Sequence, residues 1–218
     1  MKRFFKTTLA FAVVLTWFFG STAMAQHPSK AFQGEKLFVT YCYLCHGMSG
    51  KGDGPLASKI KIAPANLTDG SRIGKKTDKE LQGIIQGGKH SGLVNDEMPK
   101  WGKVIPASQI EDLVAYIRFL SLSKHPLIGD AVLGEALYAK YCTSCHGMNG
   151  KGDGILMSII PMKPADHTNS ERMEKMTNEE LVNKVANGTS EGYMPGWKRM
   201  LSDAEIAAVV SYVRILSH

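Results

Sequence analysis

The chain has 218 residues, of which 44% are hydrophobic, and a formal net charge of +6 at pH 7. Half of that excess comes from three basic residues among the first six, so the rest of the chain is too weakly basic to indicate nucleic-acid binding. Residues 26–125 carry +5 (14 basic against 9 acidic side chains) and residues 126–218 carry −2 (9 against 11), which predicts a basic end and a mildly acidic end.

The N-terminus has the three parts of a secretory signal peptide. A basic start is followed by an apolar run at 9–19 and by Ala-Met-Ala at 23–25, which fits a cleavage site. We therefore expect residues 1–25 to be removed, which leaves Gln26 as the first residue and places the protein in the periplasm or otherwise outside the cytoplasm. An uncleaved membrane anchor is the alternative, but this run is shorter than the roughly 18 to 20 residues that span a bilayer.

The rest of the chain is an internal duplication. At an offset of 100, the segment Gly-Lys-Gly-Asp-Gly occurs at 50–54 and again at 150–154. A repeat of this kind indicates two copies of one structural unit. We expect one domain at 26–122 and a second at 131–218, joined by a linker at 123–130 whose proline and glycine break any helix.

Each copy predicts a small all-α domain. In the first copy we expect a helix from about Ser29 to Cys45, a middle helix that stops at Gly87-Gly88, and a last helix where apolar residues recur at helical spacing over 110–120. No strand-like alternation competes with this pattern. Capping boxes predict three helix starts, at Thr77–Glu80, Thr177–Glu180 and Ser202–Glu205.

Gly34 and Gly134 fall inside the predicted first helix of each copy, where a glycine costs up to about 1 kcal/mol relative to alanine. A missing side chain allows another helix to cross closely. We therefore expect the last helices to lie over these glycines, with Tyr116 and Tyr212 at the crossings. The alternative is that each glycine only marks a frayed helix start.

All four cysteines occur in a pentapeptide that is written twice. Cys42, Cys45 and His46 form one Cys-x-x-Cys-His motif, and Cys142, Cys145 and His146 form the other. This motif is the attachment signature of haem c. Two thiols on one helical turn can add to the two vinyl groups of a porphyrin, and the next residue then lies beneath the iron. The sequence predicts two covalently bound haem c groups, with His46 and His146 as proximal ligands.

Two other chemistries use pairs of cysteines at this spacing. A zinc site needs two pairs that close round one ion, whereas these pairs are one hundred residues apart and each is followed by histidine. A disulfide oxidoreductase needs a βαβ context. The flanking sequence offers helical patterns and glycine-rich loops instead, so both alternatives are disfavoured.

The second axial ligand decides the function, because an open iron permits catalysis whereas a sulfur ligand favours electron transfer. The methionines with a counterpart in the other copy are Met48 with Met148 and Met98 with Met194. The first pair lies two residues after the proximal histidine, on the wrong side of the ring. Met98 and Met194 lie 52 and 48 residues downstream, which is enough chain to reach the opposite face.

A proline follows each of these two methionines, and a tryptophan lies three residues beyond each of them. We expect Trp101 and Trp197 to wall the haem and to offer their indole N–H groups to a propionate. His90 and His167 are competing axial ligands, although neither has a counterpart in the other copy.

These features together resemble a known family. A helix with Gly-x-x-x-aromatic, the haem motif, the glycine-rich loop, Pro-Ala-(Asn/Asp), a Met-Pro segment and a final amphipathic helix resemble class I cytochrome c domains in tandem, over nearly all of 30–217. The chain is similar to soluble dihaem cytochromes of the c-four type. The resemblance implies His/Met ligation, two haem pockets related by a pseudo-twofold axis, and a carbonyl near Pro64 and Pro164 that accepts a hydrogen bond from the proximal histidine.

We therefore expect an electron carrier with no catalytic activity of its own, working between respiratory redox proteins outside the cytoplasm. Its donor and acceptor would be proteins, with a membrane-bound oxidase or dehydrogenase among the candidates, and peripheral membrane association is compatible with this role. One alternative is a cytochrome subunit of a larger oxidase or dehydrogenase complex. Another is a dihaem enzyme, of the peroxidase or thiosulfate-oxidising kind, which would need a replaceable axial ligand.

Overall fold

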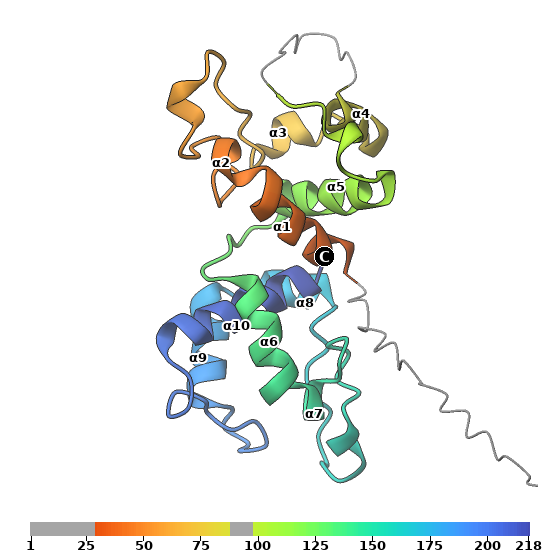
Figure 1. Cartoon of the computed structure of the whole chain (residues 1–218). Coiled ribbons are helices and arrows are strands. Elements are labelled where there is room, and N and C mark those ends of the chain that lie inside the picture. Colours follow the sequence, from red (N-terminus) through yellow and green to blue (C-terminus); the bar gives the residue numbers. More distant parts are fainter. Residues whose placement is uncertain (1–28, 88–97) are drawn as a thin grey trace, which may run out of the picture.

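The computed structural model describes residues 29–87 and 98–218, and every regular element in this part of the chain is helical, as expected (Figure 1). The predicted signal peptide and His90 lie outside the described residues. We call α1 to α5 the N-terminal module and α6 to α10 the C-terminal module. None of the described helices is both long and apolar enough to cross a membrane.

The N-terminal module contains α1 (Lys30–Tyr41), α2 (Tyr43–His46), η1 (Ala57–Lys59), α3 (Gly70–Ile73), α4 (Asp78–Gln86), η2 (Trp101–Lys103) and α5 (Ala107–Leu122). The C-terminal module repeats this order except that η2 has no counterpart, with α6 (Ala131–Tyr141), α7 (Thr143–His146), η3 (Ile155–Ser158), α8 (Ser170–Lys175), α9 (Asn178–Asn187) and α10 (Asp203–Leu216). Here η denotes a 3₁₀ helix.

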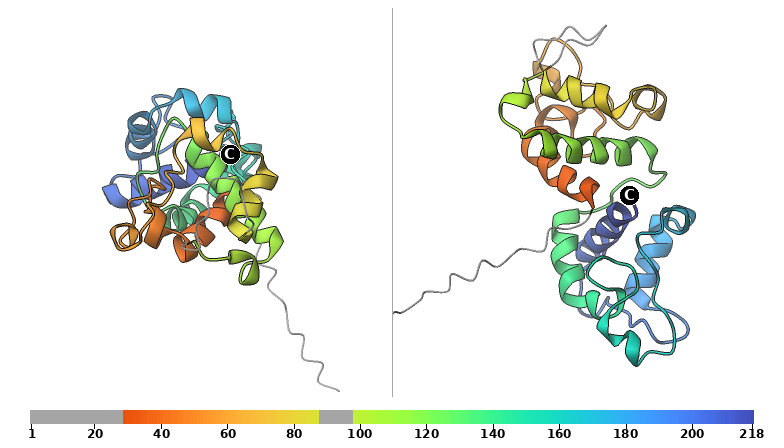
Figure 2. Two further views of the ribbon diagram at one scale, coloured as in Figure 1. Left: turned by 90° about the horizontal axis from the view of Figure 1, so that it is seen from above. Right: turned by 90° about the vertical axis from the view of Figure 1, so that its right-hand side faces the viewer.

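The first and last helices of each module cross closely, α1 over α5 and α6 over α10 (Figures 1 and 2). A Cβ atom on Gly34 would overlap the backbone carbonyl of Asp112 and lie 2.8 Å from the Cβ atom of Tyr116. Gly134 has the same relation to α10, with the Cβ atom of Tyr212 at 2.8 Å. The expectation that the last helices lie over these glycines is confirmed, and the alternative of a frayed helix start is wrong.

The predicted helix starts are also confirmed. In all three capping boxes the cap hydroxyl accepts from the backbone N–H three residues on, and the glutamate at that position accepts from the cap N–H. The middle helix of the N-terminal module ends at Gly87, which adopts φ 95°. The short helices α3 and α8 were not predicted, because one turn is too short to show helical periodicity.

The predicted continuous helix from Ser29 to Cys45 is interrupted. The helix α1 ends at Tyr41, and Cys42, with φ −116° and ψ −28°, stays in the right-handed region but with a φ more negative than that of a regular helix before α2 begins. The separate turn α2 then carries the second cysteine and the histidine. Apolar periodicity alone does not reveal such a break, because residues on both sides of it are helical.

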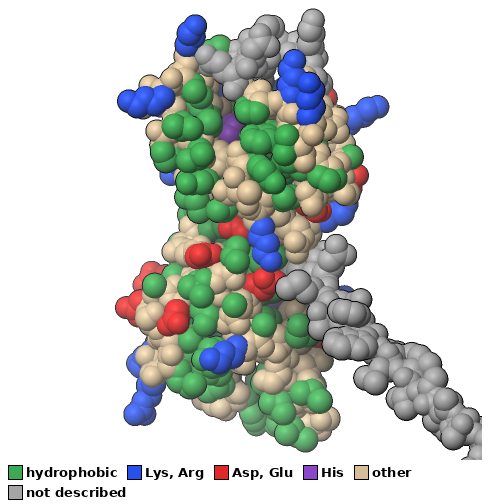
Figure 3. All heavy atoms as spheres, in the orientation of Figure 1, with side chains coloured by type: hydrophobic (Ala, Val, Ile, Leu, Met, Phe, Trp, Pro, Cys, Tyr) green, Lys and Arg blue, Asp and Glu red, His purple; other side chains and the backbone are tan. Residues whose placement is uncertain are grey.

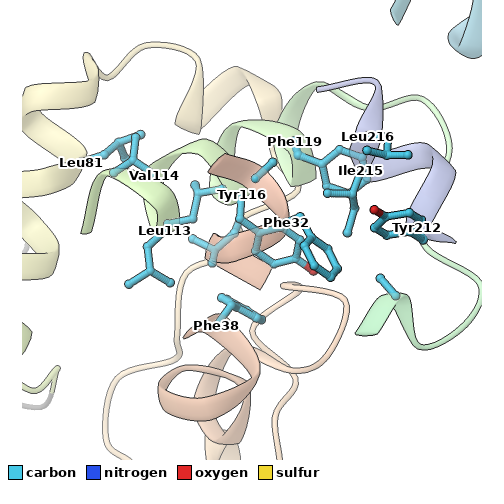
Figure 4. Close-up of a cluster of buried hydrophobic side chains, with 14 of the residues drawn as sticks. Phe32, Phe38, Leu81, Leu113, Val114, Tyr116, Phe119, Tyr212, Ile215 and Leu216 are labelled. Carbon is cyan, nitrogen blue, oxygen red and sulfur yellow. The ribbon is translucent and has the colours of Figure 1, made fainter. Parts of the chain in front are cut away.

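One hydrophobic cluster runs through both modules (Figure 4). The ring of Phe32 from α1 packs edge-on against Tyr212 from α10, with centroids 5.2 Å apart. Phe119 from α5 packs against His218 at the C-terminus at the same separation. The two modules therefore share part of their core, which fixes their relative placement.

Polar contacts reinforce this interface. Lys36 of α1 forms an ion pair with Glu135 of α6 at 3.0 Å. Glu174, which lies in α8, accepts hydrogen bonds from the hydroxyl of Ser123 and the backbone N–H of Lys124 in the connection between the modules. These bonds hold the connecting segment against the C-terminal module.

Glu35 in α1 is a buried carboxylate, 4% exposed, whose Oε2 atom has no hydrogen-bond partner among the described residues. Burial and the nearby charge of Asp130 raise its pKa to about 7, against the opposing effect of Lys36. The folded chain therefore binds more protons than the unfolded chain at this site, and this contribution destabilises the fold progressively as the pH rises from about 4.5 to 7.

We expect Glu35→Gln to remove this pH dependence and to raise the free energy of unfolding at pH 8 by about 2 kcal/mol. Urea unfolding at pH 5 and pH 8 measures both effects. The matched control is Glu135→Gln, because that side chain is partly exposed and paired with Lys36; it should leave the pH dependence in place. A Glu35→Gln variant with the wild-type pH dependence would contradict the prediction.

Candidate functional site

The two Cys-x-x-Cys-His motifs adopt the same local structure. In the N-terminal module the N–H groups of Cys45 and His46 donate to the carbonyl of Cys42, at 3.2 and 2.9 Å, and the C-terminal module repeats both bonds at the same distances. One turn thus holds the two thiols and the imidazole together. None of the four cysteines forms a disulfide, and all are half-buried.

The pKa of the first cysteine in each motif bears on whether the motif could carry out disulfide exchange. Burial raises the pKa of Cys42 to about 12, with Cys45 adding to the shift, and the same causes raise the pKa of Cys142 to about 12. Disulfide exchange needs a thiolate, which these buried thiols do not supply at neutral pH. Within the described ranges, no three His, Cys, Asp or Glu side chains gather into a metal site of the zinc type.

The motif histidines are oriented by backbone carbonyls. The Nδ1 atom of His46 lies 3.1 Å from the carbonyl oxygen of Ala65, and Nδ1 of His146 lies 3.1 Å from that of Ala165. A carbonyl can only accept, so Nδ1 carries the proton and Nε2 keeps its lone pair for a metal. Burial lowers the pKa of both imidazoles, against the effect of the carbonyl bond, and this favours the neutral form that binds iron.

The acceptor in each module is thus the residue after the expected proline, Ala65 after Pro64 and Ala165 after Pro164. Pro64 has a different role, because its carbonyl lies where a Cβ atom on Gly52 would be. Gly52 has φ 83°, and its N–H donates to the carbonyl of His46 at 2.8 Å. The proline segment and the glycine loop therefore pack on each other beside the attachment turn, and Pro164 and Gly152 repeat this contact.

The tryptophans lie beside the attachment turns. The ring centroid of Trp101 is 5.4 Å from that of Tyr41, the residue before the first cysteine. Trp197 lies 5.3 Å from Tyr141 in the same way. The tyrosines were not named as site residues from the sequence, although both copies have one at this position.

The candidate axial methionines differ from the excluded pair in exposure. Met98 is partly buried and packs against the shared cluster, and Met194 is also partly buried. Met48 and Met148 are 59% and 60% exposed. The structure thus separates the two pairs in the sense that the sequence predicted, while the bonds to iron stay a prediction.

His167 stacks on His146, with ring centroids 4.2 Å apart and planes inclined by 20°. A side chain stacked flat on the proximal imidazole lies on the proximal side, so it does not approach an iron from the opposite face. This position removes His167 from the competing axial ligands. The other competitor, His90, lies outside the described residues.

Both modules fit a covalently bound porphyrin. Each offers two thiols on one turn, a neutral imidazole with a free Nε2 atom, and a tyrosine–tryptophan pair beside them. Large hydrophobic side chains are also exposed in the segment after each attachment turn, and hydrophobic surface is visible on both modules (Figure 3). These side chains are Leu56 and Ile62 in the N-terminal module, and Ile155, Ile159 and Met162 in the C-terminal module.

The family model described as cytochrome C oxidase, cbb3-type, subunit III matches residues 29–117 and again 129–213. The chain belongs to this family. The chain consists of tandem cytochrome c domains, carries two covalently bound haem c groups and acts in electron transfer. The expected resemblance to tandem cytochrome c domains, the all-α fold and the two haem c groups are therefore confirmed.

The curated relatives are named as oxidase subunits. The cbb3-type cytochrome c oxidase subunit FixP of Azorhizobium caulinodans is 30% identical over 189 residues, which cover 84% of this chain and 59% of that protein. Subunit CcoP of Rubrivivax gelatinosus is 28% identical over 195 residues, covering 89% and 57%. The chain thus spans about three fifths of the length of these relatives.

Solved structures that are similar to this chain include a reducing HAO-like protein complex of Kuenenia stuttgartiensis. It is 24% identical with a TM-score of 0.37, and the match covers 85% of this chain and 96% of the chain in that structure. Cytochrome c6 of the diatom Phaeodactylum tricornutum is 28% identical with a TM-score of 0.32, covering 41% and 95%.

Proposed function

We propose that this chain is a dihaem electron-transfer subunit of a membrane-bound respiratory oxidase of the cbb3 type, facing the periplasm. The observation that carries the proposal is the tandem match: both modules fit the model of one oxidase subunit, and the curated relatives are named as that subunit. The sequence alone favours a free electron carrier, with an oxidase subunit as the alternative. The relatives favour the subunit.

The proposal assigns a role to each site residue. Cys42 and Cys45 would hold one haem and Cys142 and Cys145 the other, while His46 and His146 would supply nitrogen ligands and Met98 and Met194 would supply sulfur ligands. Each haem, when bound, supplies a one-electron redox centre. The chain orients the imidazoles through Ala65 and Ala165. With methionine sulfur as the second ligand, no iron position would remain for a substrate. Electron transfer is then outer-sphere and needs little rearrangement.

The shared core supports transfer between the modules. Aromatic contacts and the Lys36–Glu135 ion pair join the two modules. A fixed separation between two redox centres suits directional transfer better than a flexible link does. The basic N-terminal module and the more acidic C-terminal module offer different surfaces to a donor and an acceptor.

The decisive experiment asks where the full-length protein resides in the organism that encodes it. We expect an affinity-tagged chain to co-purify with a haem–copper oxidase from detergent-solubilised membranes, and its deletion to abolish cytochrome c oxidase activity in those membranes. As a matched control, tagged Lys151→Ala, which removes an exposed lysine, should still co-purify. Recovery of the chain as a free periplasmic protein, with membrane oxidase activity unaffected by deletion, would overturn the proposal in favour of the free carrier.

A further inference from the structure

The two modules differ at one pair of positions next to the proximal histidine. The N-terminal module has Phe38 and Leu67 there, and both are buried. At the same offset of 100, the C-terminal module has Tyr138 and His167. Two apolar side chains in one copy are thus matched by two polar side chains in the other.

The polar pair is bonded and lies against the proximal ligand. The hydroxyl of Tyr138 lies 3.0 Å from Nδ1 of His167, and the His167 ring stacks on His146 with centroids 4.2 Å apart. Tyr138 itself sits as Phe38 does, since the two rings lie 6.5 and 6.4 Å from their proximal histidines. The backbone is also equivalent, so the difference between the modules is one of side-chain chemistry.

That backbone equivalence is shown by a hydrogen bond found in both copies. The N–H of His167 donates to the carbonyl of Gly150 at 2.6 Å, and the N–H of Leu67 donates to that of Gly50 at 2.7 Å. The imidazole therefore occupies the place of the leucine side chain. Each residue of the pair can be exchanged for its counterpart without requiring a different backbone.

The His167 ring bonds the Tyr138 hydroxyl through its Nδ1 atom and lies flat against His146. An imidazole is far more polar than leucine, whichever ring nitrogen holds the proton.

Oxidation of a haem adds one positive charge to the iron and its ligands. An apolar shell disfavours that added charge, whereas a polar group beside the ligand stabilises it. A polar pair packed beside His146 therefore favours the oxidised state of the C-terminal haem. The same effect is missing at Leu67.

We propose that the Tyr138–His167 pair lowers the reduction potential of the C-terminal haem below the value that the apolar pair of the N-terminal module would give. The inference rests on the proposed ligation by His146. It makes His167 a positioning and tuning residue that acts through the proximal ligand, and it makes two otherwise similar modules unequal in potential.

The test exchanges the pair in both directions. The double variant Tyr138→Phe with His167→Leu should raise one of the two midpoint potentials in a spectroscopic redox titration of the full-length protein. The expected size is about tenfold in the reduction equilibrium constant, which is about 59 mV for a one-electron couple. The reverse exchange, Phe38→Tyr with Leu67→His, should lower the other midpoint and leave the first unchanged.

His125→Leu is the matched control, because it removes a histidine whose ring contacts the carbonyl of Glu174 at 3.1 Å, away from His146. Both midpoints should stay at their wild-type values. Haem content is measured in every variant as the pyridine haemochrome. Two haems per chain with midpoints unmoved by both exchanges, or moved in the opposite sense, would overturn this inference alone. Fewer than two haems in the wild-type protein would overturn the proposed function with it.

Discussion

Replacing Met98 or Met194 singly with alanine is expected to remove about half of the weak sulfur-to-iron charge-transfer band that a Met-ligated ferric haem c shows at the far-red end of its spectrum. Each variant should also lower the reduction potential of the affected haem, because a thioether ligand raises it. The reduced variants should bind carbon monoxide rapidly, whereas the wild-type protein should not, since loss of the sulfur opens an iron position.

Met48 and Met148 provide matched controls. Both lie two residues after the proximal histidine and are exposed, so Met48→Ala and Met148→Ala should keep the full band. Loss of the band from neither Met98→Ala nor Met194→Ala would show that the axial ligands lie elsewhere. Rapid carbon monoxide binding by the wild-type protein would instead favour the dihaem enzyme that the sequence left as an alternative.

The features that the sequence predicted well are those with short-range causes. A capping box involves four consecutive residues, and Thr77, Thr177 and Ser202 all start helices in the structure as their spacing indicates. The attachment turns are equally local. The crossings at Gly34 and Gly134 were predictable for a different reason, since two copies of the same unfavourable glycine in a helix indicate a shared constraint on packing.

What the sequence did not reveal depends on contacts between distant segments. The acceptors for His46 and His146 are Ala65 and Ala165, one residue from the predicted prolines, because loop geometry decides which carbonyl turns inward. The stacking of His167 on His146 was also missed, and the histidine was considered only as a rival ligand. Comparing the copies position by position would have shown His167 opposite Leu67 and Tyr138 opposite Phe38.

The interface between the modules was beyond sequence reasoning altogether. Phe32 and Tyr212 belong to different copies, and the counterpart of Phe32 in the second copy is Val132, so the repeat gives no sign of their contact. The duplication predicts what is equivalent within the modules. It does not predict how one module meets the other, because that contact joins positions that are not equivalent in the two copies, such as Phe32 with Tyr212.

The largest loss of stability is expected from filling the space where the helices cross. A Cβ atom on Gly34 would overlap the carbonyl of Asp112, and α1 and α5 can accommodate it only by moving apart. Overpacking of this kind costs about 3 kcal/mol or more, which exceeds the gain of about 1 kcal/mol that alanine brings to an isolated helix. We therefore expect Gly34→Ala to lower the free energy of unfolding by at least about 2 kcal/mol in guanidinium titrations followed by circular dichroism.

Gly134→Ala should destabilise to a similar extent, because its Cβ atom would overlap the carbonyl of Ala208 in α10. Thr40→Ala on the exposed side of α1 lies away from the crossing and removes only an exposed hydroxyl that donates to the carbonyl of Lys36, so it should change stability by less than about 0.5 kcal/mol. The shared core adds a consequence for the pair of glycine variants. Since one hydrophobic cluster joins the modules, each alanine should lower the unfolding midpoint of the whole protein in a single transition. Two separate transitions, with only the substituted module destabilised, would show that the modules unfold independently, and a stabilised Gly34→Ala variant would show that the helices do not cross there.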